Sequence, residues 1–370
     1  MTPLTGRRKK VLCVVGTRPE AIKLAPVILA LRDAGWCDLL VVATAQHREM
    51  LDDVLRFFAI RPDRDLDLMR ANQGLGDFAA RALGALDAVL AAAAPDAVLA
   101  QGDTTTVLAA AIAAFYRRVP FCHVEAGLRT GDLRQPFPEE FNRVVASRAA
   151  RLHFAPTKEA KANLLREGVP AEHVLITGNT VIDALYWAAE RRPPLPVTIA
   201  AEQRLILVTV HRRENFGAPL RQITAAVRRL VETDPSVAVL LPVHPNPNVR
   251  ETVAAELGGL DRVCLVPPLN YEGFVAALMH SHFVLTDSGG VQEEAPALGK
   301  PVLVMRHVTE RPEALAAGVA RLVGTDPELI LTEARRLLDD PSWYHRMARG
   351  VSPYGDGCAA PRIAAALAAL

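Results

Sequence analysis

The stretch KVLCVVGTRPEAIKLAPVILALRDAGWCDLLVVA, residues 10–43, contains the pattern that decides the fold. An apolar run over residues 10–16 predicts a buried strand, and residues 19–34 predict an amphipathic helix closed by Gly35. Residues 39–43 predict a second apolar strand. Strands that are apolar throughout and separated by helices are typical of a parallel sheet covered on both faces. This stretch therefore predicts an α/β protein.

The same alternation continues along the chain and is interrupted once. The interruption is ERRPPLPVTIAAEQ, residues 190–203, where three prolines in four positions predict a semi-rigid extended connector. Further strands before it are predicted at 97–101, 120–124, 152–155 and 174–177. Strands after it are predicted at 205–210, 237–243, 263–266, 283–286 and 301–305. Two such series predict two doubly wound domains.

The domain boundaries follow from this interruption. We expect a first Rossmann-like domain over residues 1–190, a linker over 191–199 and a second Rossmann-like domain over 200–351. The Ala-rich segment 352–370 is expected to be helical and to cross back to the first domain. Ligands of such sheets bind at the carboxyl ends of the strands. We therefore expect the two domains to face a common cleft and to hinge shut at the linker and the C-terminal crossover.

Composition and charge exclude several classes of protein. The 370 residues are half apolar and carry a net charge of +1, which gives no general attraction to nucleic acid or to an anionic membrane. The apolar run near the N-terminus is too short for a signal peptide, and no segment is long enough to span a membrane. The cysteines lack CxxC spacing, which favours reduced, buried thiols in a cytoplasmic protein over a disulfide framework or a zinc site. They are Cys13, Cys37, Cys122, Cys264 and Cys358.

LTDSGGVQEEAPALGKP, residues 285–301, places two glycines between a strand and a helix. The N–H groups of a helix entrance attract anions, and glycines let an anion approach the backbone. We therefore expect a diphosphate at Ser288–Gly290. Glu294 lies four residues beyond Gly290, about 6 Å along a helix axis, where it can accept hydrogen bonds from ribose hydroxyls. Glu293 is expected to compensate the helix dipole.

Polar clusters follow two predicted strands of the first domain. In GTRPEAIK, residues 16–23, Arg18 and Lys23 can face a common anion, or can be ordinary solvated basic residues. In QGDTTT, residues 101–106, Asp103 and the threonines after it can be functional, or can cap the next helix.

Two more acidic positions lie in the following segments. Glu125 comes directly after a predicted strand in HVEAGLRT, residues 123–130, and has no evident capping role, which favours a function. PFPEEFNRVVASR, residues 136–148, starts a helix at Pro138 and puts Glu139 and Arg143 four residues apart, on one face. Spacing alone favours a surface ion pair between them.

Two histidines end successive predicted strands of the second domain. His211 lies in VTVHRRENFG, residues 208–217, and His244 lies in PVHPNPN, residues 242–248. A lone histidine is more often structural, but two at neighbouring strand ends favour a functional site. They lack a carboxylate–histidine partner at metal spacing, so we expect no metal. The chain also lacks GxxxxGK[ST] and GxGxxG, which argues against a P-loop NTPase and an NAD enzyme.

Taken in order, the motifs resemble those of the non-hydrolysing UDP-N-acetylglucosamine 2-epimerases. The resemblance covers about Lys10 to the PYGDG of residues 353–357, and the ordered set is highly specific. The motifs are GTRPEAIK, TAQHREML, QGDTTT, HVEAGLRT, PFPEE-NR, TGNTVID, HRRENFG, PVHPNPNV, LTDSGGVQEEAP-LGKPVLVMR and TERPEA.

The resemblance implies a glycosyltransferase-B-like pair of Rossmann-type domains in a cytoplasmic homodimer. It implies reversible interconversion of UDP-GlcNAc and UDP-ManNAc without a cofactor, supplying cell-surface polysaccharide synthesis. The implied catalytic residues are Asp103, Glu125, Glu139, His211 and Arg143. The implied nucleotide-binding residues are Arg18, Lys23, His211, Phe274, Ser288, Gly289, Gly290, Glu294 and Arg311. An activator site for a second UDP-GlcNAc is implied at Gln46, Arg212 and His244.

The chemistry explains why several acids are needed. The hydrogen at C2 adjoins no carbonyl, so we expect the C1–O bond to UDP to break first and a carboxylate to remove C2–H, giving a 2-acetamidoglucal. Protonation from the opposite face and return of UDP invert C2, which requires proton carriers on two faces. The alternatives are a UDP-sugar glycosyltransferase, a hydrolysing epimerase and a non-catalytic sugar-nucleotide sensor.

Overall fold

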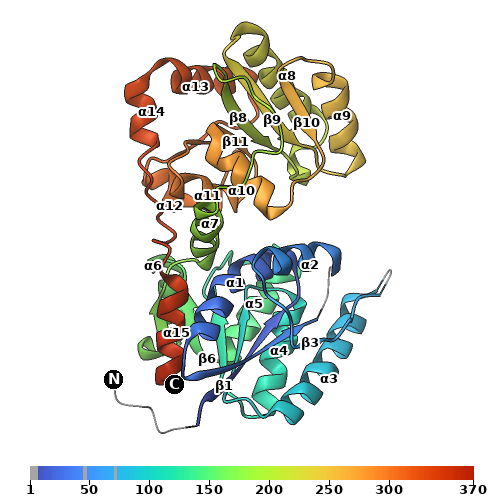
Figure 1. The fold of residues 1–370 in the computed structure, drawn as a ribbon, viewed down its shortest axis with the longest axis vertical. Helices are drawn as coiled ribbons and strands as arrows, with labels where there is room; N and C mark the ends of the chain where they lie inside the picture. Colours follow the sequence, from blue (N-terminus) through green and yellow to red (C-terminus); the bar gives the residue numbers. More distant parts are fainter. Residues whose placement is uncertain (1–6, 45–47, 71–72) are drawn as a thin grey trace. The chain divides into compact units, whose positions relative to one another are not determined.

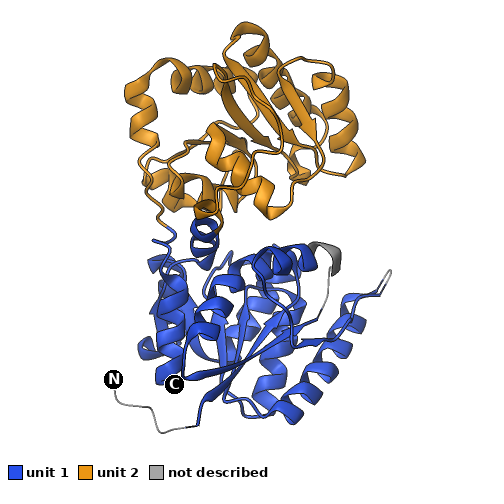
Figure 2. Ribbon diagram, in the orientation of Figure 1, with its two compact units in different colours: residues 1–187, 354–370 blue, residues 188–353 orange. Residues whose placement is uncertain are grey.

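The computed structural model describes residues 7–44, 48–70 and 73–370. Its internal contacts divide the chain into two compact units, shown in two colours in Figure 2. Unit 1 comprises Met1–Trp187 and Tyr354–Leu370, and unit 2 comprises Ala188–Pro353. The chain thus passes from one unit to the other after residues 187 and 353, where the sequence led us to expect residues 190 and 351. Each unit is described below by itself.

The described part of unit 1 is built on a seven-stranded parallel sheet with the order β3-β2-β1-β4-β5-β6-β7. Its strands are β1 (Lys9–Val15), β2 (Cys37–Ala43), β3 (Arg64–Asp65), β4 (Ala97–Gln101), β5 (Phe121–Val124), β6 (Ala150–Ala155) and β7 (Val174–Ile176). Its helices are α1 (Arg18–Asp33), α2 (Arg48–Phe57), α3 (Leu75–Ala93), α4 (Thr105–Tyr116), α5 (Glu139–Ala149), α6 (Lys158–Arg166), the 3₁₀ turn η1 (Ala171–His173), α7 (Thr180–Glu190, which continues into unit 2) and α15 (Ala359–Ala369).

The strand order of unit 1 reverses direction between β1 and β4, which are neighbours in the sheet. The chain leaves these two strands in opposite directions, so a crevice remains between their carboxyl ends. Sheets of this kind bind ligands in that crevice. Gly16 and Thr17 follow β1, and Gly102 and Asp103 follow β4. Because the central strands are buried and apolar, their ends are held firmly and can place side chains accurately.

Unit 2 repeats this architecture with a six-stranded parallel sheet, in the order β10-β9-β8-β11-β12-β13. Its strands are β8 (Arg204–Thr209), β9 (Val237–Pro242), β10 (Val263–Val266), β11 (Ser281–Thr286), β12 (Val302–Val304) and β13 (Ala320–Leu322). Its helices are η2 (Arg213–Asn215), α8 (Ala218–Thr233), α9 (Pro247–Leu257), α10 (Tyr271–His280), α11 (Val291–Ala297), α12 (Pro312–Ala316), α13 (Pro327–Asp339) and α14 (Pro341–Met347). Here the order reverses between β8 and β11, so His211 and Ser288 follow the two strands at the crevice.

The C-terminal segment returns to unit 1, where α15 packs against α1 (Figure 1). The entrance of α15 leaves backbone N–H groups without partners inside the helix. The carboxylate of Asp183 on α7 accepts hydrogen bonds from the N–H groups of Ala359 and Ala360, at 3.2 and 2.8 Å. The aspartate of the TGNTVID motif therefore anchors the returning chain.

The predicted fold class, α/β with two doubly wound parallel sheets, is confirmed. Two short edge strands, β3 and β13, were not predicted from the sequence. The expectation of buried thiols holds for Cys13, Cys37 and Cys122. Cys264 is only partly buried, and Cys358 is exposed because it lies in the loop before α15. Within the described ranges, no helix combines the length and apolar character that a membrane crossing requires.

Candidate active site

A pocket of about 410 Å³ opens at the crevice of unit 1. It brings together four of the residues selected from the sequence, namely Lys23, Asp103, Glu125 and Glu139. The complete lining is Thr17, Pro19, Glu20, Lys23, Leu75, Gln101, Gly102, Asp103, Thr104, Thr105, Glu125, Pro138, Glu139 and Asn142. Arg18 begins α1 beside this pocket and is half-buried.

The three acids of this pocket that were selected from the sequence do not share one electrostatic environment. Burial raises the pKa of Asp103 to about 6, which Arg143 opposes and the charges of Glu125 and Glu139 reinforce. Glu125 instead pairs with Lys23, whose Nζ lies 2.5 Å from Oε2. Near pH 6, Asp103 is therefore partly protonated beside an acid that is paired with a cation.

Glu125 has an unusual backbone conformation. Its φ of +62° lies in the left-handed region, which costs a non-glycine residue about 1 kcal/mol or more. Gly127 follows at φ +93°, and a Cβ there would lie 2.2 Å from the carbonyl oxygen of Ala160. The chain thus turns sharply just after β5, and this turn places the Glu125 carboxylate at the pocket.

The ion pair that spacing favoured, between Glu139 and Arg143, is wrong, because the partner of Arg143 is a different glutamate. Arg143 pairs with Glu140, at 2.6 Å, and lies 3.3 Å from the carboxylate of Asp103. Glu140 is 1% exposed and also accepts hydrogen bonds from the N–H groups of Thr130 and Gly131. Residues three and four apart on a helix are equally good neighbours, so spacing could not choose between Glu139 and Glu140.

Glu20 is a buried acid that sequence reasoning missed. It is 2% exposed, and its carboxylate accepts hydrogen bonds from the N–H groups of Gly16 and Thr17, at 2.7 and 2.6 Å. Its other oxygen accepts from the hydroxyl of Thr104 at 2.5 Å, so it connects the loop after β1 to the loop after β4. The signal was the capping-box spacing of Thr17 and Glu20. Thr104 caps α4, as the capping alternative for QGDTTT proposed, while Asp103 faces the pocket.

Glu20 gives a testable pH dependence of stability. Burial outweighs its hydrogen bonds and raises its pKa from 4.5 to about 7. A carboxyl group with a raised pKa in the folded state stabilises the fold below about pH 4.5, and this contribution of about 3 kcal/mol is lost as pH rises through 7. Glu20→Gln cannot ionise, so its melting temperature relative to wild type should rise over this window. Calorimetry at several pH values measures the difference, and a constant offset would contradict the assignment.

Unit 2 places the Ser288-Gly289-Gly290 segment at its own crevice, between β11 and α11. Glu294 is 7% exposed, and its Oε2 lies 3.9 Å from the place of a Cβ on Gly290, so the carboxylate folds back toward the segment. Glu310 also approaches this segment, since a Cβ on Gly289 would lie 2.8 Å from its Oε1. Glu310 is held by Arg212 and Arg306, at 2.9 and 2.5 Å.

Glu293 does more than compensate the helix dipole. It is 3% exposed and pairs with Arg311, whose Nε lies 2.5 Å from its Oε1. Next to it, Gln292 accepts a hydrogen bond from the hydroxyl of Thr309 at 2.6 Å. The TERPEA segment, which contains Arg311, is therefore held by α11. Phe274, the other residue implied for the nucleotide in this unit, is half-buried in the first turn of α10.

The two histidines predicted to lie together do so. The rings of His211 and His244 stack with their centroids 6.2 Å apart and their planes 26° apart. Burial and the neighbouring His211 lower the pKa of His244. The Nδ1 of His211 lies 3.1 Å from the carboxylate of Asp287, a residue to which sequence reasoning assigned no role. Gln46, the remaining residue of the implied activator site, lies outside the described residues.

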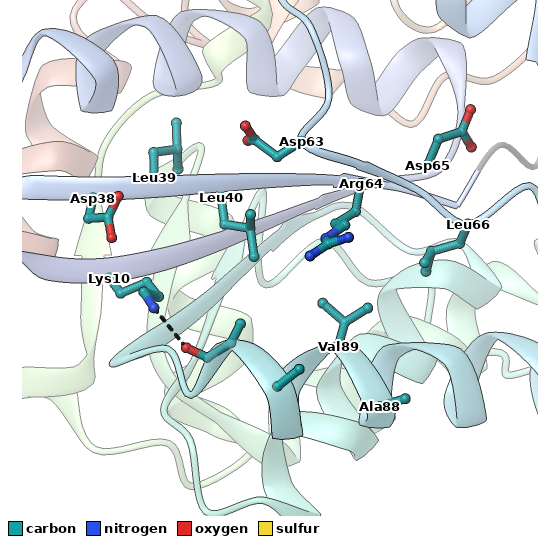
Figure 3. Close-up of a pocket in the computed structure, with 12 residues that line it drawn as sticks. Lys10, Asp38, Leu39, Leu40, Asp63, Arg64, Asp65, Leu66, Ala88 and Val89 are labelled. Carbon is teal, nitrogen blue, oxygen red and sulfur yellow. Dashed lines mark hydrogen bonds between the residues drawn. The ribbon is translucent and has the colours of Figure 1, made fainter.

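A larger cavity lies elsewhere in unit 1, as Figure 3 shows. It has a volume of about 740 Å³, and its lining includes Lys10 near the start of β1 and Asp38 near the start of β2, away from the carboxyl ends of these strands. The side chain of Lys10 donates a hydrogen bond across it to the carbonyl oxygen of Ala93, and alanines of α3 line one wall (Figure 3). The acidic residues selected from the sequence therefore line the smaller pocket and not this cavity. Within the described ranges, no three His, Cys, Asp or Glu side chains are arranged to hold a metal ion.

Comparisons with known proteins agree with the motifs. Residues 29–368 match the family described as UDP-N-acetylglucosamine 2-epimerase. A UDP-N-acetylglucosamine 2-epimerase of Yersinia pestis is 51% identical over 97% of this chain and 98% of its own length. The UDP-GlcNAc 2-epimerase of Neisseria meningitidis, solved bound to UDP-GlcNAc, matches with a TM-score of 0.89 and 45% identity over 98% of this chain and 100% of its own. The enzyme of Methanocaldococcus jannaschii, solved with UDP-GlcNAc and UDP, matches with a TM-score of 0.79 and 30% identity over 98% and 100% of the two chains.

Proposed function

Because this chain belongs to the UDP-N-acetylglucosamine 2-epimerase family, we propose that it is an isomerase that reversibly converts UDP-GlcNAc into UDP-ManNAc. The proposed route is elimination of UDP to a 2-acetamidoglucal, protonation at C2 from the opposite face, and return of UDP to C1. The single observation that supports it best is the convergence of Asp103, Glu125 and Glu139 on one pocket.

The acids of unit 1 are suited to the two proton transfers. Removal of C2–H needs an ionised carboxylate, and Glu125 is paired with Lys23. Delivery of a proton to the other face needs a protonated acid, and the pKa of Asp103 is raised to about 6 by its burial. We propose Glu139 as the third member of the proton-carrying set, with Arg143 setting the charge next to Asp103.

We further propose that unit 2 holds the nucleotide. Gly289 and Gly290 offer backbone N–H groups to the diphosphate beside Ser288, whose own N–H donates to the hydroxyl of Thr286 at 2.9 Å, and Glu294 lies beside them for the ribose hydroxyls. His211, Arg18 and Lys23 add positive charge for the departing diphosphate. Phe274 and Arg311 complete the proposed nucleotide contacts. Residues 191–199 are proposed as the hinge between the domains.

Incubation of the purified protein with UDP-GlcNAc, followed by proton NMR of the sugar, tests the function. The proposal predicts an equilibrium mixture of UDP-GlcNAc and UDP-ManNAc. Free ManNAc with UDP would instead indicate a hydrolysing epimerase. Transfer that occurs only after an acceptor is added would indicate a glycosyltransferase, and binding without any turnover would indicate a sensor.

The regulatory and cellular parts of the proposal depend on the family resemblance. We propose that Gln46, Arg212 and His244 bind a second UDP-GlcNAc as activator, and that a cytoplasmic homodimer supplies UDP-ManNAc for cell-surface polysaccharide. Two large aromatic side chains at the end of α4, Phe115 and Tyr116, are 64% and 69% exposed, which supports a protein contact there. Light scattering during gel filtration measures the mass of the assembly.

A further inference from the structure

Asp287 is a fully buried carboxylate at the crevice of unit 2. It is 0% exposed and immediately precedes Ser288. Its Oδ2 accepts hydrogen bonds from the N–H groups of His211 and Arg212 and from the Nδ2 of Asn215, at 3.0, 2.9 and 3.0 Å. Its Oδ1 accepts from the N–H of His211 and lies 3.1 Å from the imidazole Nδ1 of the same residue. One carboxylate thus holds both the backbone and the ring of His211.

These contacts keep Asp287 ionised. Burial alone would raise its pKa, but the hydrogen bonds and the charge of His211, together with the backbone N–H groups, outweigh burial and lower it. The ionised carboxylate of Asp287 can only accept hydrogen bonds. The Nδ1 of His211, which faces it, must therefore be the donor and carry a proton. The Nε2 is then the ring nitrogen left for a ligand, and 39% of the His211 side chain is exposed.

We propose that Asp287 is a positioning residue for the reaction, acting through His211. It holds the imidazole ring in place through its Nδ1 and places a negative charge beside the ring, so that the Nε2–H of the imidazolium can donate to the diphosphate oxygen that leaves C1. This inference rests on the proposed function, which places the diphosphate at the adjacent Ser288–Gly290. Asp287 would thus influence the leaving group without touching the substrate itself.

The proposed step is balanced without a further reactant. The C1–O bond breaks and its electron pair goes to the diphosphate oxygen. The C2–H proton goes to a carboxylate, and the electron pair of the C2–H bond forms the C1=C2 double bond. The imidazolium of His211 donates a hydrogen bond to the oxygen as its charge develops. The titratable groups that contact the ring are Asp287 and the stacked His244, and the next residue in the chain, Arg212, pairs with Glu310. His244 has a lowered pKa and is neutral beside the ring, so Asp287 supplies the facing negative charge.

Asp287→Asn tests the proposal because an amide has one accepting oxygen and one donating NH₂ group, whereas the carboxylate accepts at both oxygens. Its oxygen can replace Oδ2, which has three donors, and its NH₂ group then faces Nδ1 of His211. The ring must accept there, so the proton moves to Nε2. We expect ¹⁵N NMR of the histidine rings to show the tautomer change and kcat to fall by about 10²-fold. The affinity for UDP should change much less.

Two comparisons separate positioning from a merely structural role. In a His211→Asn background, Asp287→Asn should cause little further loss of kcat, because the residue it acts through is already absent. Glu333→Gln is a matched control, since it also removes a buried carboxylate of unit 2, one that pairs with Arg321 at 3.0 Å, and it should retain kcat and the His211 tautomer. Equal losses from Asp287→Asn in both backgrounds, or an unchanged tautomer, would overturn the proposal. A wild-type protein that fails to epimerise would instead overturn the proposed function, whatever the NMR shows.

Discussion

Replacement of Glu125 by glutamine is expected to lower kcat for epimerisation by about 10²–10⁴-fold, the usual contribution of a general acid or base. The amide has nearly the same shape but cannot take the proton from C2. Glu125 lines the pocket of unit 1 and is directed into it by its left-handed backbone conformation, which glutamine tolerates as well as glutamate does. The nucleotide contacts proposed in unit 2 are untouched, so the affinity for UDP should be nearly normal.

Steady-state kinetics and titration calorimetry with UDP measure the two quantities separately. Glu167→Gln is a suitable control in the same unit, because Glu167 also pairs with a basic side chain, Arg129 at 2.6 Å, but lies outside the lining of the pocket. It should retain kcat. Normal turnover by Glu125→Gln would remove Glu125 from the catalytic set.

Glu140→Gln is expected to lower the free energy of unfolding by about 3 kcal/mol, because it leaves a buried guanidinium without its charged partner. Glu140 accepts from two backbone N–H groups and from the Nε of Arg143, at 2.7 Å. In the variant, the amide NH₂ meets a guanidinium that can only donate. Arg143 should then pair more closely with Asp103, which is 3.3 Å away, and lower the raised pKa of that acid.

The expected consequence for activity is a loss of kcat in addition to the loss of stability. Urea unfolding measures the stability, and rates at a temperature well below the melting transition measure the activity of the folded variant. Glu139→Gln, one residue earlier, is the control for stability, since Glu139 is only partly buried at the start of α5. Equal stability of Glu140→Gln and wild type would show that Glu140 is not the partner that holds Arg143.

The fold was largely predictable because its signal is local. Apolar strands such as β1 and β4 alternate with helices, and a parallel sheet follows from that alternation. Asp103 and Glu125 were predictable for the same reason, because they follow strands, and the structure brings them to one pocket with Glu139 at the start of α5. The edge strand β3 was missed because two residues give no periodic pattern.

The buried acids could not be assigned from the sequence. Glu20, Glu140 and Asp287 accept hydrogen bonds from backbone N–H groups, and a sequence carries no mark of which N–H groups a fold leaves without partners. The choice of Glu139 as the partner of Arg143 failed for a related reason. Both glutamates fit helical spacing, and only the burial of Glu140 decides between them.

The central claim is that UDP leaves C1 and returns while carboxylates exchange the hydrogen at C2 with solvent. The most direct measurement is incubation of the wild-type protein with UDP-GlcNAc in D₂O, followed by NMR of the recovered nucleotide sugar. The account predicts deuterium at C2 in both UDP-GlcNAc and UDP-ManNAc. Formation of UDP-ManNAc that keeps its original hydrogen at C2, or recovery of unlabelled UDP-GlcNAc alone, would contradict it.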